Sequence, residues 1–376
     1  MDLKNIKHFS IDRNSWVATF GGGTLLGDVT KQLSDNGGRA IAHGTCPQVG
    51  LGGHATMGGL GPTSRQWGTT MDHVLEAQVV LANSTIVRAS ETQNSDLFFA
   101  VKGAGASFGI VTEFKMRTQP KPSQDVVYQF NIVGHDTATK AKAFKSWLKW
   151  IADPNLSRKF ASQFILSDIG AVIYGTYFGS KAEFDALNIT SKFPESDDTV
   201  VVKDWLGTVA DWAVNLSLQL VGTVPSNYYS KSFEYTANDI LSDQGVDNLL
   251  SWIDNANKGT PIWFVIFDLA GGAINDVAPD KTAYAHRDTL FYSQSYAVNL
   301  FGKVTPTIRN FLEDFNANIK NNLPNSDLGA YPGYVDTYLP NAQVAYWGDN
   351  YPRLQQVKGA WDPNDVFQNP QSVKKA

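Results

Sequence analysis

Only one cysteine, Cys46, occurs among the 376 residues, so the chain can form no internal disulfide. A single cysteine also disfavours a zinc site, because His43 and His54 do not complete a metal-ligand spacing, and we expect no metal. No apolar run approaches the roughly 20 residues that cross a bilayer, so no membrane partner is expected. The net charge of −5 is the opposite of the basic footprint that nucleic-acid binding leaves. We therefore expect a monomer that acts on a small molecule.

The two common nucleotide-binding glycine motifs are also missing. In the one candidate for G-x-G-x-x-G, Gly50 and Gly52 are followed by Ala55 in place of the third glycine. No G-x-x-x-x-G-K-[ST] occurs, so neither a Rossmann loop nor a P-loop is predicted.

Signals for secretion are weak. The first residues lack the basic and apolar regions of a signal peptide. Four N-x-[ST] sequons favour secretion slightly, although an Asn-rich chain yields several by chance. Their asparagines are Asn83, Asn155, Asn188 and Asn215.

Glycine, in contrast, is concentrated in two places. Residues 43–61 hold seven glycines together with Cys46 and two of the six histidines. Glycine at this density lets the backbone approach a bulky ligand and turn its N–H groups toward phosphate oxygens. The alternative is a surface loop with a small buried cysteine. Residues 102–112 are the second glycine-rich stretch, and they have two interpretations. They could approach a ligand closely, or they could form a tight connection into a strand over 110–116.

The remaining pattern predicts an α+β chain in two structural regions, as its length suggests. Residues 2–20 predict a strand pair, residues 25–36 a helix, and residues 74–90 a hairpin. Pro120 and Pro122 mark a boundary. Beyond them, an antiparallel sheet of four to seven strands with helices on one face is predicted. Its strands are expected at 126–132, 160–166, 171–178 and 263–269, and its helices at 138–151, 182–193, 240–257 and 305–319.

Four motifs, taken together, identify a family. They are Gly44-Thr45-Cys46-Pro47-x-Val49-Gly50-x-Gly52-Gly53-His54; Lys102-Gly103-x-Gly105-x-x-Phe108-Gly109-Ile110-Val111; Tyr331-Pro332-Gly333-Tyr334-Val335-Asp336; and Asp362-Pro363-x-Asp365-Val366-Phe367-x-Asn369-Pro370. The chain resembles the berberine-bridge-enzyme-like, FAD-linked oxidases with a PCMH-type FAD-binding domain, and among them the fungal glucooligosaccharide oxidases. The resemblance spans essentially the whole chain.

The resemblance implies three regions and their ligands. Residues 1–122 would form the FAD-binding domain, residues 123–325 the substrate domain, and residues 326–376 a terminal segment that returns to the FAD domain. FAD would be attached covalently through Cys46, and the family's extracellular location is expected. The implied FAD contacts are Gly44, Thr45, Cys46, Val49, Gly50, Gly52, Gly53, His54, Gly103, Gly105, Phe108, Gly109, Ile110, Val111 and Asn350. The implied substrate contacts are Phe264, Gln294 and Tyr331, whereas His286 and Arg287 are expected to be structural.

The implied reaction oxidises a hydroxyl-bearing carbon, with C1 of an oligosaccharide giving a lactone, and reduces O2 to H2O2. Tyr334 matches the family's catalytic tyrosine, and Asp268 matches the residue that accepts its hydrogen bond. A phenol titrates at about 10 and a nearby carboxylate raises its pKa further. We therefore expect Asp268 to orient Tyr334 and to take up proton density, and Cys46 to react as a thiolate.

Three departures from the family pattern keep alternatives open. The family's upstream Gly-Gly-His-Ser-type segment, with a second flavin bond and half of the pyrophosphate site, precedes the point where this sequence begins. By the resemblance, the family's sugar-contacting Arg and Glu are replaced near Gln163 and Ile165, and Ile266 stands where a sugar-binding Gln is common. An oxidase of a secondary metabolite and an inactive, truncated homologue with an exposed edge near residues 2–20 are therefore the alternatives.

Overall fold

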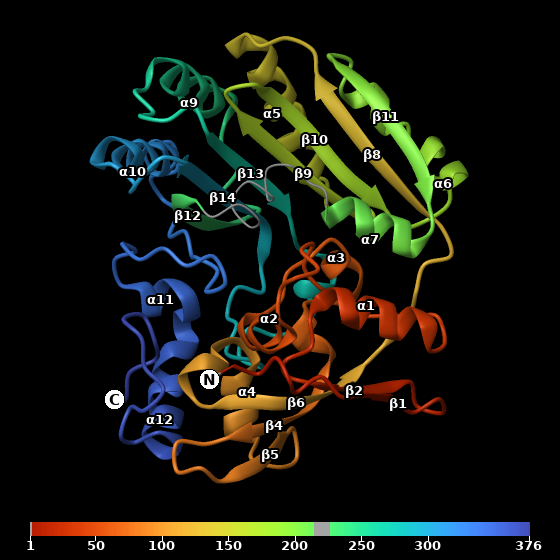
Figure 1. Cartoon of the computed structure of the whole chain (residues 1–376). Helices are drawn as coiled ribbons and strands as arrows, with labels where there is room; N and C mark the ends of the chain where they lie inside the picture. Colours follow the sequence, from red (N-terminus) through yellow and green to blue (C-terminus); the bar gives the residue numbers. More distant parts are fainter. Residues whose placement is uncertain (1, 214–225) are drawn as a thin grey trace. The chain divides into compact units, whose positions relative to one another are not determined.

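The structure is a computed structural model that describes residues 2–213 and 226–376 (Figure 1). The chain divides into two compact units, and each is assembled from segments distant in the sequence. Unit 1 comprises Met1–Lys121, Gly272–Arg287 and Thr337–Ala376, and unit 2 comprises Pro122–Gly271 and Asp288–Asp336.

The observed boundaries differ from the sequence prediction at two places. Residues 272–287 are predicted within the substrate domain, but they belong to unit 1. The reason is an ion pair inside unit 1, in which the Arg287 guanidinium lies 2.9 Å from a carboxylate oxygen of Asp72. The C-terminal return also begins at Thr337 and not at residue 326. The first boundary lies at Lys121–Pro122, one residue from the predicted position.

Unit 1 is built on a five-stranded antiparallel sheet with the order β1-β2-β6-β4-β5. The strands are β1 (Phe9–Ile11), β2 (Val17–Gly21), β4 (Val74–Val80), β5 (Ile86–Ser90) and β6 (Ile110–Arg117). Alternate residues such as Phe20 and Phe114 are fully buried, as expected when one face of each strand meets the core. The predicted strand pair and hairpin are confirmed, and β1 is an edge strand.

Short helices connect these strands. They are α1 (Leu26–Asp35), α2 (Leu51–Met57), α3 (Ser64–Trp67) and α4 (Ser95–Ala104), and β3 (Arg39–Ala40) pairs with β7 (Gln119–Pro120). The helix predicted over 25–36 is confirmed as α1, which ends before Gly37 and Gly38, both with positive φ. The last turn of α4 is non-helical at Lys102 and Gly103.

Unit 2 is built on a seven-stranded sheet with the order β11-β8-β10-β9-β13-β14-β12, in which every neighbouring pair is antiparallel. Its strands are β8 (Asp125–Ile132), β9 (Phe160–Ser167), β10 (Gly170–Tyr177), β11 (Ser196–Lys203), β12 (Asn227–Thr236), β13 (Trp263–Leu269) and β14 (Thr289–Asn299). The α+β class with an antiparallel substrate sheet is thereby confirmed.

Three helices cover one face of this sheet: α5 (Thr137–Ile151), α9 (Asp243–Asn255) and α10 (Pro306–Asn321) (Figure 1). Each begins at a side chain that accepts a backbone N–H of the first turn, namely Asp136, Ser242 and Thr305. Phe144 of α5 packs between the strands, with ring centroids 4.7 Å from Phe164 and 4.6 Å from Phe267. Helix α7 (Trp205–Ala213) packs on part of the other face, where Trp212 donates to Thr176.

Some elements of unit 2 differ from the sequence prediction. The helix predicted over 182–193 is wrong: α6 (Lys181–Ala186) is followed by a separate 3-10 turn (Ile189–Lys192). Asn188 between them has φ 47°, a left-handed conformation that interrupts a right-handed helix. Strands β11, β12 and β14 and helix α7 are not predicted from the sequence.

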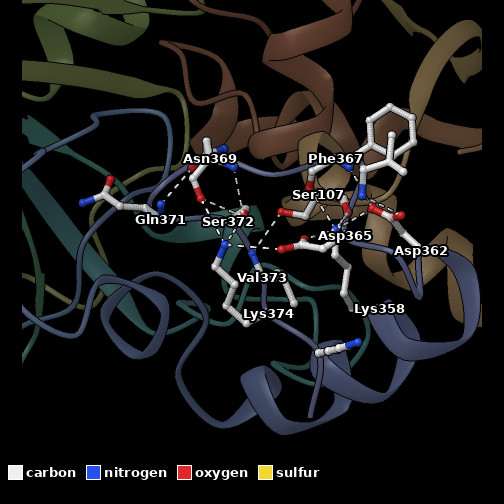
Figure 2. A network of polar contacts seen from close by, with 12 residues as sticks. Ser107, Lys358, Asp362, Asp365, Phe367, Asn369, Gln371, Ser372, Val373 and Lys374 are labelled. Carbon is white, nitrogen blue, oxygen red and sulfur yellow. Dashed lines mark hydrogen bonds and ion pairs between the residues drawn. The ribbon is translucent and has the colours of Figure 1, made fainter.

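The C-terminal segment of unit 1 contains α11 (Ala342–Trp347) and α12 (Tyr351–Trp361). Figure 2 shows how a fully buried lysine, Lys358, holds the segment together. Its ammonium group contacts Asp362 at 2.7 Å and donates to the backbone oxygens of Ser107 and Phe367, both at 2.8 Å. The chain end is thus fastened to the second glycine-rich stretch.

Further observations concern membranes, metal ions and glycosylation sites. No described helix is long and apolar enough to cross a membrane, and the described residues contain no cluster of three or more metal-ligating side chains. The sequon asparagines Asn83, Asn155 and Asn188 are exposed. The fourth, Asn215, lies outside the described residues.

Candidate functional site

The cysteine loop of unit 1 connects β3 to α2, and buried histidines hold its entry. His73 accepts the backbone N–H of Ala42 at 3.1 Å, and His54 accepts that of Gly44 at 2.9 Å. His43 contacts the Thr30 hydroxyl and the Gly44 carbonyl, each at 2.8 Å. These bonds fix the backbone just before Cys46.

Burial keeps these histidines neutral, which their role as acceptors requires. Burial lowers the pKa of His54 to about 3 and that of His73 to about 4. The predicted cofactor residue His54 therefore orients the loop through Gly44.

Cys46 itself is half-buried, and its sulfur lies 3.9 Å from the Thr45 hydroxyl. Val49, three residues on, is 38% exposed. The thiol and its neighbours are therefore accessible, in contrast to the buried cysteine of the alternative interpretation.

The glycines around Cys46 test whether FAD fits this loop. A Cβ added at Gly50 or Gly53 would meet no atom of the described chain within 4 Å. Gly53 lies in α2, where glycine costs about 0.5–1 kcal/mol relative to alanine. Neither chain packing nor a positive φ explains these two glycines. The open space at these two glycines leaves room for a bulky planar group beside Cys46, so the loop is compatible with FAD.

The other predicted glycines have neighbours in the chain. An added Cβ would meet Gly22 from Gly52, Thr56 from Gly105 and Val79 from Gly109, at 2.5–2.7 Å. At Gly44 it would lie 2.9 Å from the His54 ring. Gly103 has φ +128°, and a Cβ there would lie 2.4 Å from the nitrogen of Tyr284.

The second glycine-rich stretch is therefore a packed connection within unit 1. Phe108 is fully buried and Val111 nearly so, while Ile110 begins β6. The Phe108 side chain is packed within the chain itself, and an FAD contact of this stretch stays a prediction.

Asn350 has a structural role that the sequence does not reveal. Its buried amide nitrogen donates to the carbonyls of Pro279, Thr282 and Ala283 at 2.7–3.4 Å. His286 likewise contacts the Ala345 carbonyl at 2.9 Å, as its expected structural role requires. These bonds tie residues 272–287 to the C-terminal segment, and an FAD contact of Asn350 stays a prediction.

The predicted catalytic residues lie together in unit 2. Asp268 is near the end of β13 and pairs in register with Gln163 of β9, whose amide donates to the Asp268 carboxyl at 3.3 Å. Tyr334 follows on the loop after α10, and its ring contacts Tyr331, which in turn contacts Tyr292, the residue paired with Asp268 on β14. Within the described residues the hydrogen bond to Asp268 comes from Gln163, whereas the sequence predicts it from Tyr334.

Both pKa values are raised here. Burial raises the pKa of Asp268 to about 7, against a weaker opposing effect of Gln163. Burial, followed by the charge of Asp268, raises the pKa of Tyr334 well above its ordinary value. At neutral pH the phenol therefore keeps its proton, while the carboxyl can accept one.

An aromatic cluster surrounds this pair. Tyr331 lies with its ring centroid 4.9 Å from that of Tyr334 and 6.2 Å from that of Tyr292. Phe264 stacks on Tyr296 at 5.0 Å, and the Tyr296 hydroxyl donates to Gln294 at 3.1 Å. The three predicted substrate residues thus lie on or beside the sheet face of Asp268. Sequence reasoning missed Tyr292 and Tyr296 as members of the cluster.

A buried ion pair anchors the tyrosine loop. Lys231 of β12 lies 2.6 Å from Asp336, and the side chains are 7% and 3% exposed. Tyr229 also donates to Asp336 at 3.2 Å, and Ser232 donates to the Tyr334 carbonyl at 3.3 Å. The sequence motif contains Asp336, but its partner Lys231 is about a hundred residues away and carries no sequence signal.

Gly333 also has a local explanation. A Cβ at this position would lie 2.3 Å from the Tyr331 ring. The position where the resembling family usually has Asn is thus covered by an aromatic ring, and glycine is what fits.

Two protein-family models match parts of the chain. One is described as "FAD binding domain" and matches residues 1–90, and the other as "Berberine and berberine like" and matches residues 330–374. The FAD-linked oxidoreductase sorD of Penicillium rubens is 39% identical over 99% of this chain and 80% of its own length.

Solved structures match the whole chain. A chitooligosaccharide oxidase superposes with a TM-score of 0.90 and 30% identity, covering 100% of this chain and 81% of the other. The glucooligosaccharide oxidase of Acremonium strictum is described as containing 6-S-cysteinyl, 8α-N1-histidyl FAD. It superposes with a TM-score of 0.88 and 31% identity, covering 100% of this chain and 82% of the other.

Proposed function

The chain belongs to the berberine-bridge-enzyme-like, FAD-linked oxidoreductases, and from this we propose that it oxidises a hydroxyl-bearing carbon of a small molecule with O2. When bound, FAD accepts two electrons from the substrate and passes them to O2, which leaves as H2O2. The observation that carries the proposal is the placement of the half-buried Asp268 and Tyr334 at one aromatic cluster, where burial and the charge of Asp268 raise the pKa of the Tyr334 phenol.

The two residues divide the proton transfer. Tyr334 cannot hold a phenolate at neutral pH, so it takes the substrate's hydroxyl proton only as it passes its own to Asp268. The carboxyl, with a pKa of about 7, is suited to accept that proton. Gln163 orients the carboxyl, and the Lys231–Asp336 pair orients the loop of Tyr334.

Cys46 is proposed as the covalent attachment point of FAD. Gly50 and Gly53 would lie against the flavin, and His54 would hold the loop in place through Gly44. A thioether through a cysteine is known for the Acremonium strictum relative by its description. Mass spectrometry of the denatured chain after incubation with FAD tests this: the mass should increase by one FAD, and the increase should disappear in Cys46→Ser.

Activity tests the rest of the proposal. Peroxide release should be measured for the FAD-loaded chain with cellobiose, xylobiose and a set of benzylic alcohols. Tyr334→Phe should lower turnover by about 10² to 10⁴, the size of a general-base contribution, with the FAD content unchanged. An FAD-loaded chain that releases no peroxide with any of these alcohols would contradict the proposal.

Two substrate classes remain candidates. Oligosaccharide oxidases among the relatives support a sugar, whose C1 would be oxidised to a lactone. The partly exposed Ile165, which pairs with the fully buried Ile266 beside Asp268, supports a less polar hydroxylated molecule, because its side chain offers a sugar no hydrogen bond.

A further inference from the structure

A cleft with a volume of about 590 Å³ lies within unit 1. Part of its lining is one face of α4, where Phe98 and Lys102 stand four residues apart. Further lining residues come from residues 277–282, from Arg353 of α12 and from Arg117 at the end of β6. Segments that are distant in the sequence therefore meet at this cleft.

Positive side chains outnumber carboxylates in the lining of the cleft. The cations are Lys102, Arg117, Lys281 and Arg353, and the carboxylates are Asp72, Glu91 and Asp280. Asp72 is already neutralised, because Arg287, which does not line the cleft, contacts both of its oxygens at 2.9 Å. Four cations thus face two remaining carboxylates, which leaves two positive charges in surplus on a chain whose net charge is −5.

Lys102 is the cation for which this surplus has the largest consequence. Its ammonium group is half-buried and lies 5.1 Å from the centre of the Phe98 ring. Burial lowers the pKa of Lys102, although the charge of Asp72 acts against this. A cation over a ring keeps its three N–H donors, and those of Lys102 meet no acceptor among the described residues. A desolvated ammonium is costly unless an anion pairs with it.

Arg353 is presented to the cleft in a similar way. Its guanidinium lies 3.6 Å from the centre of the Phe99 ring, and one nitrogen donates to the Asp280 carbonyl at 3.0 Å. Its other N–H groups have no hydrogen-bond acceptor in residues 2–213 and 226–376. A guanidinium with free donors is a planar fork, a geometry that suits carboxylate and phosphate oxygens.

The other two cations have a simpler explanation when taken alone. Arg117 and Lys281 are exposed, and water can solvate them. Lys102 and Arg353 differ, because an aromatic ring holds each side chain in place with unused donors. An anion that contacts these two would also be attracted by the exposed pair. The surplus of two charges corresponds to a ligand with at least two negative charges.

We propose that this cleft binds a small polyanion, a molecule with two or more phosphate or carboxylate charges, through Lys102 and Arg353. Cys46, Asp268 and Tyr334 do not line the cleft, so the site is additional to the residues proposed for FAD attachment and for catalysis. A bound polyanion links α4 to α12 and should stabilise unit 1 by mass action.

Calorimetry with two simple polyanions tests the site. The FAD-loaded chain is titrated with pyrophosphate and with citrate in a low-salt buffer, and sodium chloride at matched ionic strength is the control. At least one polyanion should bind saturably at a single site, with an affinity that falls as salt is added. Binding of pyrophosphate alone assigns the site to phosphates, and binding of citrate alone assigns it to carboxylates. No binding of either above the chloride control would overturn the proposal.

Two cations on β6 provide matched variants. Arg117 lines the cleft, whereas Lys115, two residues before it, pairs with Glu76 at 2.9 Å and does not line the cleft. Arg117→Gln should weaken polyanion binding by about twofold to fivefold, the size of an exposed charge contact, and Lys115→Gln should weaken it less. Equal effects of the two substitutions would overturn the placement of the polyanion in this cleft.

Two further variants test the charges with opposite signs. Lys102→Met should weaken binding by about tenfold or more, because it removes a charged hydrogen-bond donor. Thermal denaturation checks that this variant folds, since Lys102 is half-buried. Glu91→Gln removes a lining carboxylate and should tighten binding, a gain that a folding defect cannot produce. Unchanged or weaker binding in Glu91→Gln would contradict the proposed site.

The chain without FAD separates this site from the cofactor. The polyanion should bind with the same affinity before and after FAD loading. Pyrophosphate that binds only before loading would overturn the proposal, because the cations would then belong to the FAD site. Peroxide release is no part of this test, so a failure here leaves the proposed oxidase unaffected.

Discussion

At the scale of single residues, the two groups proposed for proton transfer differ in what burial does for them. Burial keeps the Tyr334 phenol protonated, which makes it a poor base alone, while it moves the pKa of the Asp268 carboxyl to about 7. Burial thus makes Tyr334 unsuitable as the final proton acceptor and makes Asp268 suitable. The proposed proton transfer therefore needs both residues.

The pH dependence of turnover follows from Asp268. Since the carboxylate form accepts the proton, turnover should rise as the pH increases through about 7, where the folded-state carboxyl ionises. In Asp268→Asn that rise should disappear and turnover should fall by about 10² or more. The measurement is flavin reduction rate against pH, with bound FAD as the control. A rise that persists in Asp268→Asn would place the titrating base elsewhere.

Gly333 makes a second prediction at this scale. Gly333→Asn restores the residue usual in the family, but its Cβ would lie 2.3 Å from the Tyr331 ring and must displace it. Because Tyr331 packs against Tyr334, turnover should fall although no proposed catalytic residue changes. Gly302→Asn is the control, since its nearest neighbour would lie 4.0 Å away. Unchanged turnover in Gly333→Asn would show that the ring relaxes without moving Tyr334.

At the scale of elements, α12 begins a lysine–aspartate pair with the same four-residue spacing as a pair on α1 but with a very different exposure. Lys358 and Asp362 stand four residues apart with no exposed surface, whereas Lys31 and Asp35 have the same spacing at 74% and 50% exposure. The buried Lys358 also donates hydrogen bonds to two backbone carbonyls, so the packing of α12 depends on it.

The two pairs predict different stability effects. Lys358→Met leaves a buried carboxylate without its charge partner and should lower the free energy of unfolding by about 3–5 kcal/mol. Lys31→Met removes an exposed pair and should cost less than about 1 kcal/mol. Urea denaturation measures both. Similar losses for the two variants would mean that the α12 network contributes little.

Elements with strong local patterns could be predicted from the sequence, and those without them could not. The α1 helix, the β4–β5 hairpin and the strands of the sheet centre follow from periodicity and turn residues. The edge strand β11 has a mostly exposed pattern, and a strand exposed on both faces gives no alternating signal. The helix break at Asn188 depends on one left-handed residue, which propensity does not reveal.

The site shows the same division. Cys46 and Tyr334 can be predicted because they stand in motifs, and Asp268 follows from the family resemblance. Tyr292 reaches the site through strand register and Lys231 through its ion pair with Asp336, and a single sequence contains neither relation. The glycines of the second motif make room for neighbouring segments of unit 1, and their contact with FAD stays a prediction.

At the scale of the whole molecule, histidines with lowered pKa values and carboxyl groups with raised pKa values contribute to the pH dependence of stability. His54 and His73 have folded-state pKa values of about 3 and 4, below the ordinary 6.5. Their stabilising contribution is full above about 6.5 and is lost as the pH falls toward those values. Asp125 and Asp268 have folded pKa values of about 7, above the ordinary 3.8. Their contribution is present below about 4 and is lost as the pH rises toward 7.

Asp125 allows this balance to be tested away from the candidate site. Asp125→Asn removes a group that resists ionisation in the folded state, so the variant should gain stability relative to wild type at pH 8 compared with pH 5. His73→Gln should show the reverse trend, losing more at pH 7 than at pH 4. Thermal denaturation at these pH values provides the measurement. A difference that does not vary with pH would show that neither group titrates on unfolding.

The interleaving of the two units also has a consequence for synthesis. Unit 1 receives the cysteine loop early, but its last segment, Thr337–Ala376, leaves the ribosome after all of unit 2. The Lys358 network cannot close on Ser107 until that moment, and the Gly103 carbonyl meanwhile lacks its hydrogen bond from Trp347. Unit 2 is closed earlier, with the arrival of Asp336 beside Lys231. The nascent chain therefore completes its substrate sheet first, and the half that would receive FAD is the last to become whole.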